Sequence, residues 1–315
     1  MLALQAPNRS VTLALLCAVI AVLAMVFPSG YYYRVAALVW ISAIAAIGLN
    51  ILMGYAGQVS LGHAGFLGIG AYSVAIGPAR FGLNPWLCIL IGMLLSTGLA
   101  WLVGRPILRL KGHYLAIATL GFGFLTALVL ANETRWTGGP DGMAVARLSV
   151  AGVRLTSSVA WYWISGTLLV LASAVALNLY DSATGRALRA LQASEIAAAT
   201  SGIDVARHKL WAFIIAAAYA SIAGSALAFF DGFITPDAAG FLRSIELVAM
   251  VVVGGIGSTV GSIVGAGLLV TLPQLLTVFV EYEQVALGFI IMLVMIFFRR
   301  GIVPSAQRFI VRRWS

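Results

Sequence analysis

The sequence predicts an all-α polytopic membrane protein with about ten transmembrane helices. Of its 315 residues, 62% are hydrophobic and only 9% are charged, and the mean hydropathy is +1.03. Several apolar runs approach the roughly 20 residues that a helix needs to cross the hydrocarbon core. The short segments of alternating hydrophobicity that a membrane β-barrel requires do not appear.

The expected crossings follow one another along the whole chain. The first run follows only one basic residue, Arg9, and has no convincing cleavage site, so we interpret it as a helix rather than a signal peptide. The shortest run, 243–256, is either a crossing or a re-entrant or broken helix. The ten expected crossings are 11–27, 35–53, 58–77, 86–104, 113–131, 160–180, 209–230, 243–256, 258–279 and 284–298.

A glycine-dense stretch, "GYAGQVSLGHAGFLGIGAY" (54–72), stands out among these runs. Its glycines fall on several helix faces and polar side chains accompany them. Irregular backbone at membrane depth is tolerated only where protein buries it or where it lines a wet cavity. We therefore expect 54–66 to be an interrupted segment beside a translocation path, with a crowded helix contact as the alternative. The pathway candidates are Asn50, Gln58, Ser60, Gly62, His63 and Gly65.

His63 has two interpretations of its own. An ionisable residue within the membrane suggests a gating or substrate role. A neutral histidine between glycine and alanine can equally hydrogen-bond a neighbouring backbone group. A metal site is disfavoured, because His113 and His208 lie in other loops and no cysteine pair accompanies them.

Small residues also recur at helical spacing in the C-terminal half. Gly257, Gly261 and Gly265 form a double GxxxG, and Ala220, Gly224 and Ala228 form a second stripe. Helices in lipid associate largely through such close backbone packing. Both stripes predict tight helix contacts.

A tight turn, "TGGPDGM" (137–143), follows the fifth expected crossing. So many glycine and proline residues in a short stretch predict a specific turn rather than a flexible loop. We expect Gly138, Gly139, Pro140 and Asp141 to lie in an external loop, about 132–159, and to help dock a binding protein. A purely structural turn is the alternative.

The stretch "GRALRALQASEIAAATSGIDVARHKLWAF" (185–213) reads as short alanine-rich helices in a loop of about 181–208. Such a helix can seat in a groove of a separate motor subunit, whereas the alternative is an ordinary basic connecting loop. The residues expected to couple to an ATPase are Arg186, Arg189, Glu195, Ala197, Ala198 and Gly202.

Basic residues set the expected orientation. Under the ten-helix count, three basic clusters fall on one side, which the positive-inside rule assigns to the cytoplasm together with both termini. Arg135, Arg147 and Arg154 in the external loop depart from the rule, and Glu133 and Asp141 offset them in part. The clusters are Arg105, Arg109 and Lys111; Arg186, Arg189, Arg207 and Lys209; and Arg299, Arg300, Arg308, Arg312 and Arg313.

Several functions are disfavoured by what the sequence lacks. Neither lysine, Lys111 or Lys209, ends a phosphate-binding G-x-x-x-x-G-K-[ST] motif, so we expect no ATPase site and no cofactor in this chain. Carboxylates within the apolar runs are few, which argues against a proton-coupled carrier. The net charge of +9 fits cytoplasmic loop flanks rather than nucleic-acid binding. No segment is large enough for a soluble core, so residues 1–315 form a single transmembrane domain.

The quoted stretches, with "GHYLAIATLGFG" (112–123) and "ELVAMVVVGGIGSTVGSIVGAGLL" (246–269), resemble the permease family of branched-chain amino acid ABC importers, the LivH/LivM family, and its M-type subunits in particular. The segment around Glu195 corresponds to that family's ATPase-contacting loop. Here the glycine, Gly202, follows seven positions after Glu195, and the residues "EIAAATSG" match the family's general pattern only loosely.

The resemblance implies a bacterial inner-membrane subunit that forms half of a pathway for branched-chain or related amino acids. It also implies a homologous H-type permease partner, two cytoplasmic subunits that use ATP, and an extracytoplasmic substrate-binding protein. The family includes permeases for urea and short amides, which remain an alternative. A stand-alone channel or secondary carrier is the alternative from another class.

Overall fold

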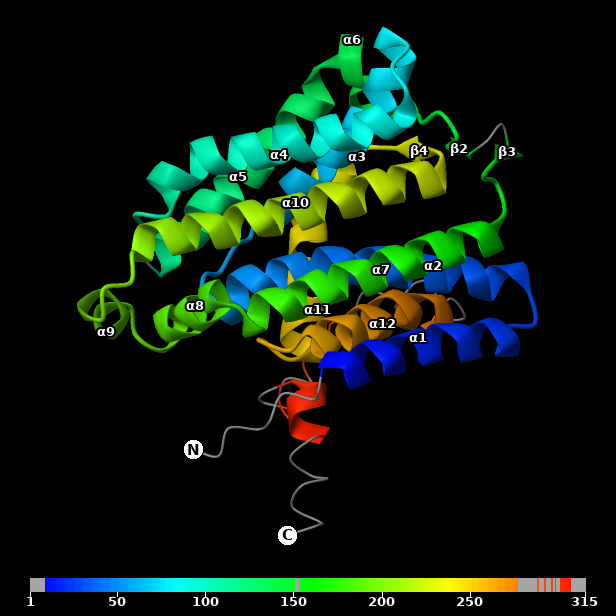
Figure 1. Cartoon of the computed structure of the whole chain (residues 1–315). Helices are drawn as coiled ribbons and strands as arrows, with labels where there is room; N and C mark the ends of the chain where they lie inside the picture. Colours follow the sequence, from blue (N-terminus) through cyan, green and yellow to red (C-terminus); the bar gives the residue numbers. More distant parts are fainter. Residues whose placement is uncertain are drawn as a thin grey trace.

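The computed structural model describes residues 9–110, 112–150, 153–276 and 301–306, with single residues 288, 292, 296 and 298. Long helices lie side by side in a bundle (Figure 1). The helices are α1 (Arg9–Val26), α2 (Gly30–Asn50), η1 (Ile51–Tyr55), α3 (His63–Phe81), α4 (Pro85–Ile107), α5 (His113–Asn132), α6 (Thr134–Thr137), η2 (Gly139–Asp141), α7 (Ser158–Asp181), α8 (Ala183–Ala193), α9 (Glu195–Thr200), α10 (Val205–Asp231), η3 (Pro236–Ala239), α11 (Phe241–Gly254) and α12 (Thr259–Leu276).

The two ends of the bundle differ. Helices α8 and α9 lie at one end, here called the α9 end, and the short strands lie at the other, here called the strand end (Figure 1). Strand β1 (Met143–Ala144) pairs antiparallel with β4 (Phe233–Ile234), and β2 (Ser149–Val150) pairs with β3 (Val153–Arg154). The β1–β4 pair joins the segment after α6 to the segment that follows α10.

Within the described residues, six helical spans are long and apolar enough to cross a membrane, which confirms the predicted all-α polytopic membrane fold. They are Arg9–Val26, Gly30–Tyr55, Pro85–Ile107, His113–Asn132, Ser158–Asp181 and Val205–Asp231, and Thr259–Gln274 is a shorter apolar helix. The predicted number of ten is not confirmed, and the last expected crossing, 284–298, lies almost entirely outside the described residues.

The expected crossing 58–77 begins too early. Helix α2 continues into a turn of π-helix, η1, and residues 56–62 are then irregular until α3 begins at His63. Gly57 has a φ of 67°, a left-handed conformation that ends the helix and that side chains rarely adopt. The predicted interruption in the glycine-rich segment is therefore present, and it lies between two helices rather than within one.

Helix α2 forms the centre of the bundle, with 14 of its 21 residues buried, whereas only three of the 18 residues of α1 are buried. Its second half is rich in alanine and glycine, so neighbouring helices approach closely. A Cβ atom added at Gly48 would lie 2.4 Å from the Cβ of Tyr219 in α10. The large apolar side chains of α1, α4 and α5 point instead to the surface of the chain, as lipid-facing helices do.

Both small-residue stripes pack against backbone, as expected. A Cβ added at Gly265 would lie 1.9 Å from the carbonyl oxygen of Met250 in α11, and one added at Gly224 would lie 1.9 Å from that of Leu67 in α3. Helix α11 has 14 residues, contains most of the expected short crossing 243–256, and follows the strand β4 and the 3-10 helix η3. The α-helical part is therefore short and is preceded by other backbone conformations, in keeping with the interpretation as a broken helix.

Candidate translocation and coupling sites

Asn50 joins the two glycine-dense regions of the chain. Its Oδ1 accepts the Gly257 N–H at 2.8 Å, and its Nδ2 donates to the Ser258 carbonyl at 2.9 Å. A Cβ added at Gly54 would lie 2.4 Å from the Gly257 nitrogen. Asn50 is therefore a clamp on the turn between α11 and α12, and both polar atoms of its side chain are used within the chain.

Three other pathway candidates are buried without partners. Neither the amide of Gln58, the hydroxyl of Ser60 nor either ring nitrogen of His63 has a hydrogen-bond partner in the part of the chain that the structure describes. All three side chains are almost fully buried. Buried polar atoms nearly always find a partner in native proteins, and those that do not require an explanation such as water, a ligand or a change of conformation.

The glycines of the same segment make a contact with α5. A Cβ added at Gly62 would lie 1.8 Å from the carbonyl oxygen of Thr119, whereas one added at Gly65 would meet its nearest neighbour, the Gly123 Cα, at 3.3 Å. The Leu61 N–H donates to Thr119 Oγ1 at 3.1 Å. In this conformation the segment is closed against α5, so the crowded contact that the sequence left open as an alternative is real.

The loop between α7 and α10 forms two helices with defined starts. Ser182 and Ser194 cap α8 and α9 through their side chains, and Asp204 caps α10. Leu188 and Leu191 of α8 are buried against the bundle. Capping and burial on one face fix this pair of short helices, which are too short to be stable alone.

Arg186 and Arg189 are engaged by their own chain. Arg186 Nη1 donates to the Asp181 carbonyl at 2.8 Å, and Arg189 Nη1 donates to the Tyr180 carbonyl at 2.6 Å. The guanidinium of Arg189 also lies 3.8 Å from the centre of the Tyr180 ring, which in turn contacts the ring of Tyr55 in η1. These arginines therefore fasten α8 to the end of α7 and, through two tyrosines, to the interrupted segment.

Helix α9 exposes one of the two alanines that the sequence suggested, together with a larger residue that it did not suggest. Ala198 is only 3% exposed and faces the bundle, whereas Ala197 is exposed and Ile196 is 80% exposed. Sequence reasoning missed Ile196, although an isoleucine between a glutamate and three alanines in a polar loop is a signal for a covered surface. Gly202 has a φ of 82° and follows the end of α9.

Glu195 has a partner that was also missed. Nζ of Lys209, whose side chain is almost fully buried, donates to Glu195 Oε1. The pair ties the start of α9 to the first turns of α10. Removing either partner leaves a charge with less compensation, which is most unfavourable for the buried lysine.

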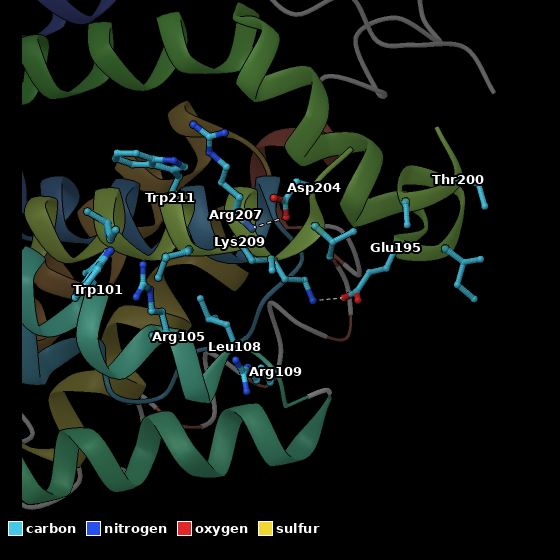
Figure 2. Close-up of a pocket in the computed structure, with 17 residues that line it drawn as sticks. Trp101, Arg105, Leu108, Arg109, Glu195, Thr200, Asp204, Arg207, Lys209 and Trp211 are labelled. Atoms are coloured by element: carbon cyan, nitrogen blue, oxygen red, sulfur yellow. Dashed lines mark hydrogen bonds and ion pairs between the residues drawn. The ribbon is translucent and has the colours of Figure 1, made fainter. Parts of the chain in front are cut away.

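Beside this ion pair lies a cavity of about 1070 Å³ between the end of α4, α9 and the start of α10 (Figure 2). Arg105 of α4 stacks on Trp101 at 3.9 Å from its ring centre. Four cationic side chains and two acidic ones line the cavity, together with Ile196 and two tryptophans. The charged residues are Arg105, Arg109, Arg207, Lys209, Glu195 and Asp204.

At the strand end, the expected turn is a short 3-10 helix, Gly139–Asp141. Gly138, Gly139 and Gly142 all have positive φ. A Cβ added at Gly142 would lie 2.1 Å from the Ile234 carbonyl oxygen, so the turn packs against β4. Pro140 is the second residue of this turn, and Asp141 is exposed.

The family described as "branched-chain amino acid transport system / permease component" matches residues 31–298. The LivM permease proteins of the high-affinity branched-chain amino acid transport systems of Salmonella typhimurium and Escherichia coli K12 are each 35% identical over 87% of this chain and 70% of their own length.

A second group of relatives is more distant. The LivH permease protein of Escherichia coli K12 is 27% identical over 84% of this chain and 92% of its own length. No solved structure matches. From the extent of the family match and the identity to the LivM proteins, the chain belongs to the family of permease components of branched-chain amino acid transport systems.

Proposed function

We propose that this chain is the M-type permease subunit of an ATP-binding-cassette importer and forms half of its translocation pathway. An H-type permease forms the other half, two cytoplasmic subunits hydrolyse ATP, and an extracytoplasmic binding protein delivers the substrate. Similarity to both LivM and LivH proteins supports a pair of homologous permeases. The cargo is a branched-chain or related amino acid.

The proposed orientation places the α9 end in the cytoplasm of a bacterium and the strand end outside the inner membrane, with both termini cytoplasmic. The cluster of Arg105, Arg109, Arg207 and Lys209 around one cavity at the α9 end supports this orientation under the positive-inside rule. Asp141 at the strand end is then available to the binding protein.

A membrane-impermeant thiol reagent should label Asp141→Cys from outside intact cells and Ile196→Cys only after permeabilisation. The reverse pattern would overturn the orientation.

The exposed Ile196 on α9 carries the proposal that α8 and α9 couple to an ATPase subunit. The charged side chains of Arg186, Arg189 and Glu195 on this pair are all hydrogen-bonded within the chain. A large apolar side chain that stays exposed on such a rigid element favours a protein partner. The adjacent cavity, with its four cations, suits an acidic rim on that partner.

The interrupted segment supports the pathway half of the proposal. Gln58, Ser60 and His63 have unused donors and acceptors in a closed interior. Broken helices near the substrate path are typical of transporters. These groups gain partners when the segment opens to water or substrate during the transport cycle, while Asn50, Gly62 and Gly65 hold the surrounding backbones together.

Association with an ATPase distinguishes this proposal from a stand-alone channel or carrier. We expect the chain to co-purify with an H-type permease and an ATPase, and a bifunctional thiol reagent to link Ile196→Cys to a cysteine in the groove of that ATPase. Ala183→Cys, exposed at the start of the neighbouring helix α8, serves as the control for non-specific linking. A chain that purifies alone and transports in that state would refute the proposal.

A further inference from the structure

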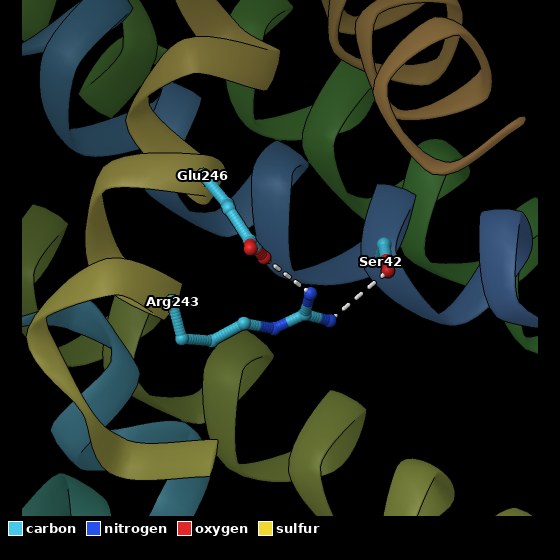
Figure 3. A network of polar contacts seen from close by, with 3 residues as sticks. All are labelled: Ser42, Arg243 and Glu246. Carbon is cyan, nitrogen blue, oxygen red and sulfur yellow. Dashed lines mark hydrogen bonds and ion pairs between the residues drawn. The ribbon is translucent and has the colours of Figure 1, made fainter. Parts of the chain in front are cut away.

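An ion pair of α11 lies beside the central helix α2. Arg243 Nη1 donates to Glu246 Oε2 at 2.8 Å, and Arg243 Nη2 donates to the Ser42 hydroxyl at 3.3 Å (Figure 3). Arg243 and Glu246 are one helical turn apart, so both side chains project from the same face of α11. Ser42 is buried in α2.

The contact with Ser42 gives the depth of this pair. Ser42 lies close to the middle of the 26-residue apolar span Gly30–Tyr55. Helix α11 is short. The hydroxyl oxygen of Ser244, the residue that follows Arg243, accepts a hydrogen bond of 3.1 Å from the N–H of Ala64 at the start of α3. The pair therefore lies beside the middle of α2, and the charge of Arg243 also acts on Asp231 at the end of α10.

The same face of α11 is open in the isolated chain. The side chain of Glu246 is 54% exposed and that of Arg243 is 22% exposed. A charged side chain in the middle of the hydrocarbon core costs about 2.5–3.5 kcal/mol or more, so this face does not contact lipid in the assembled protein. Either the partner permease covers it or it borders a water-filled path.

We infer that the Arg243–Glu246 pair is a pathway site for the head group of a zwitterionic α-amino acid. The guanidinium binds the α-carboxylate in a bidentate manner, and the Glu246 carboxylate binds the α-ammonium. In the empty state the two side chains neutralise each other, and the substrate exchanges one ion pair for two. Arg34 and Asp231, which pair at 3.5 Å at the strand end, offer the same two charges nearer the outside.

This inference deepens the proposed function and rests on it, because it names the cargo class of the same pathway. A site with one positive and one negative group matches a zwitterion and matches urea or a short amide poorly, since those carry no charge to exchange for the internal ion pair. The aliphatic part of the cargo would lie against Ile245 and Leu242, which are exposed on the neighbouring face.

The test uses the complete transporter in proteoliposomes without the binding protein, so that only the pathway selects the ligand. The native cysteines are removed first, by replacing Cys17 with serine and Cys88 with alanine. A single cysteine is then introduced as the reporter, Ile245→Cys, and its rate of reaction with a negatively charged methanethiosulfonate is measured. Leu94→Cys, near the middle of α4 and also exposed, is the lipid-facing control. Leucine, leucinamide and urea are compared as protecting ligands.

We expect Ile245→Cys to react and Leu94→Cys to resist, and leucine alone to slow the reaction. Arg243→Gln, added to the reporter, should weaken protection by leucine roughly tenfold or more while the transporter stays assembled. An unreactive reporter, absence of leucine protection or equal protection by urea would overturn the inference. ATP-driven leucine uptake by the parent complex, with the binding protein added, is measured in parallel, because its loss would instead mean that the proposed function is wrong.

Discussion

The interrupted segment 54–66 and the helix pair α8–α9 differ in how their polar groups are used. In α8 and α9, Arg186, Arg189 and Glu195 all bond within the chain while the surface of α9 stays exposed. In the interrupted segment, Gln58 and Ser60 are buried and have no partner in the described part of the chain. An exposed element whose polar groups are all hydrogen-bonded within the chain suits rigid docking to a partner. A buried segment whose polar groups lack hydrogen bonds suits a role in which the segment rearranges.

The largest effect is expected where the interrupted segment meets α5. Gly62→Ala would place a methyl group 1.8 Å from the Thr119 carbonyl oxygen, which is backbone and cannot move aside cheaply. We expect a loss of stability at or above the upper end of the ~1–3 kcal/mol typical of overpacking, and a loss of uptake. Yield of the assembled complex and its thermal unfolding in detergent measure the first effect.

Matched alanine substitutions separate this contact from general effects of glycine replacement. Gly98→Ala and Gly121→Ala lie in helices with no atom within 4 Å of the added carbon, so both should be neutral or slightly stabilising. Gly65→Ala, with 3.3 Å available, should lie between these extremes. Equal behaviour of Gly62→Ala and Gly98→Ala would show that the segment is not closed on α5.

The next effect is a loss of coupling without a loss of folding. Ile196→Asp puts a charge on the exposed face of α9, where it would be unpaired in a partner's groove. We expect assembly with the ATPase and transport to fall at least about tenfold, while the permease keeps its thermal stability. Uptake and ATPase co-purification check the first part, and unfolding of the isolated permease checks the second.

Ala198→Asp provides the contrast within the same helix. Because Ala198 faces the bundle, the aspartate should destabilise the permease itself rather than only uncouple it. If Ala198→Asp left folding intact and Ile196→Asp did not, the orientation of α9 would be the opposite of that described.

A smaller effect is expected at the ion pair beneath α9. Glu195→Gln leaves Lys209 buried with a weaker acceptor, and we expect a loss of about 1–2 kcal/mol, less than for a fully buried pair because Glu195 is partly exposed. Lys209→Met in the same chain should recover part of that loss. Chemical unfolding of the four variants of a double-mutant cycle gives the coupling, and a coupling near zero would contradict the role of the pair in fixing α9.

The smallest effect is expected at His63. His63→Gln keeps a neutral donor and acceptor but cannot relay protons, so uptake should remain within a few-fold of the parent. His63→Leu, which removes both groups at similar bulk, should reduce uptake more if these groups bind water or substrate. Near-complete loss of transport in His63→Gln, in a complex that still assembles, would instead indicate proton transfer.

Much of the fold could be predicted from apolar runs, because membrane crossings depend mainly on length and hydropathy. The interruption near Gly57 was predicted from glycine density, but its limits were not. Helix α3 begins at His63 rather than 58 because η1 prolongs α2 and Gly57 then turns the chain. Local sequence does not specify that extension, at whose start Asn50 is hydrogen-bonded to the distant Gly257.

Site residues were predicted less well, since their roles depend on which way each side chain points. Ala197 and Ala198 are equivalent in sequence, yet only Ala198 is buried. The partner of Glu195, Lys209, lies 14 positions away in another helix. In the sequence, Arg243 and Glu246 fall at the start of the run 243–256, and only the contact with Ser42 places them beside the middle of the span Gly30–Tyr55.

Leucine uptake by proteoliposomes that contain this chain, an H-type permease and the ATPase subunits, supplied with binding protein outside and ATP inside, tests the proposed role most directly. We expect uptake to require ATP hydrolysis, to stop with a non-hydrolysable analogue, and to be lost in Ile196→Asp. Uptake by this chain alone, or uptake that is independent of ATP and unaffected by Ile196→Asp, would contradict a permease driven through α8 and α9.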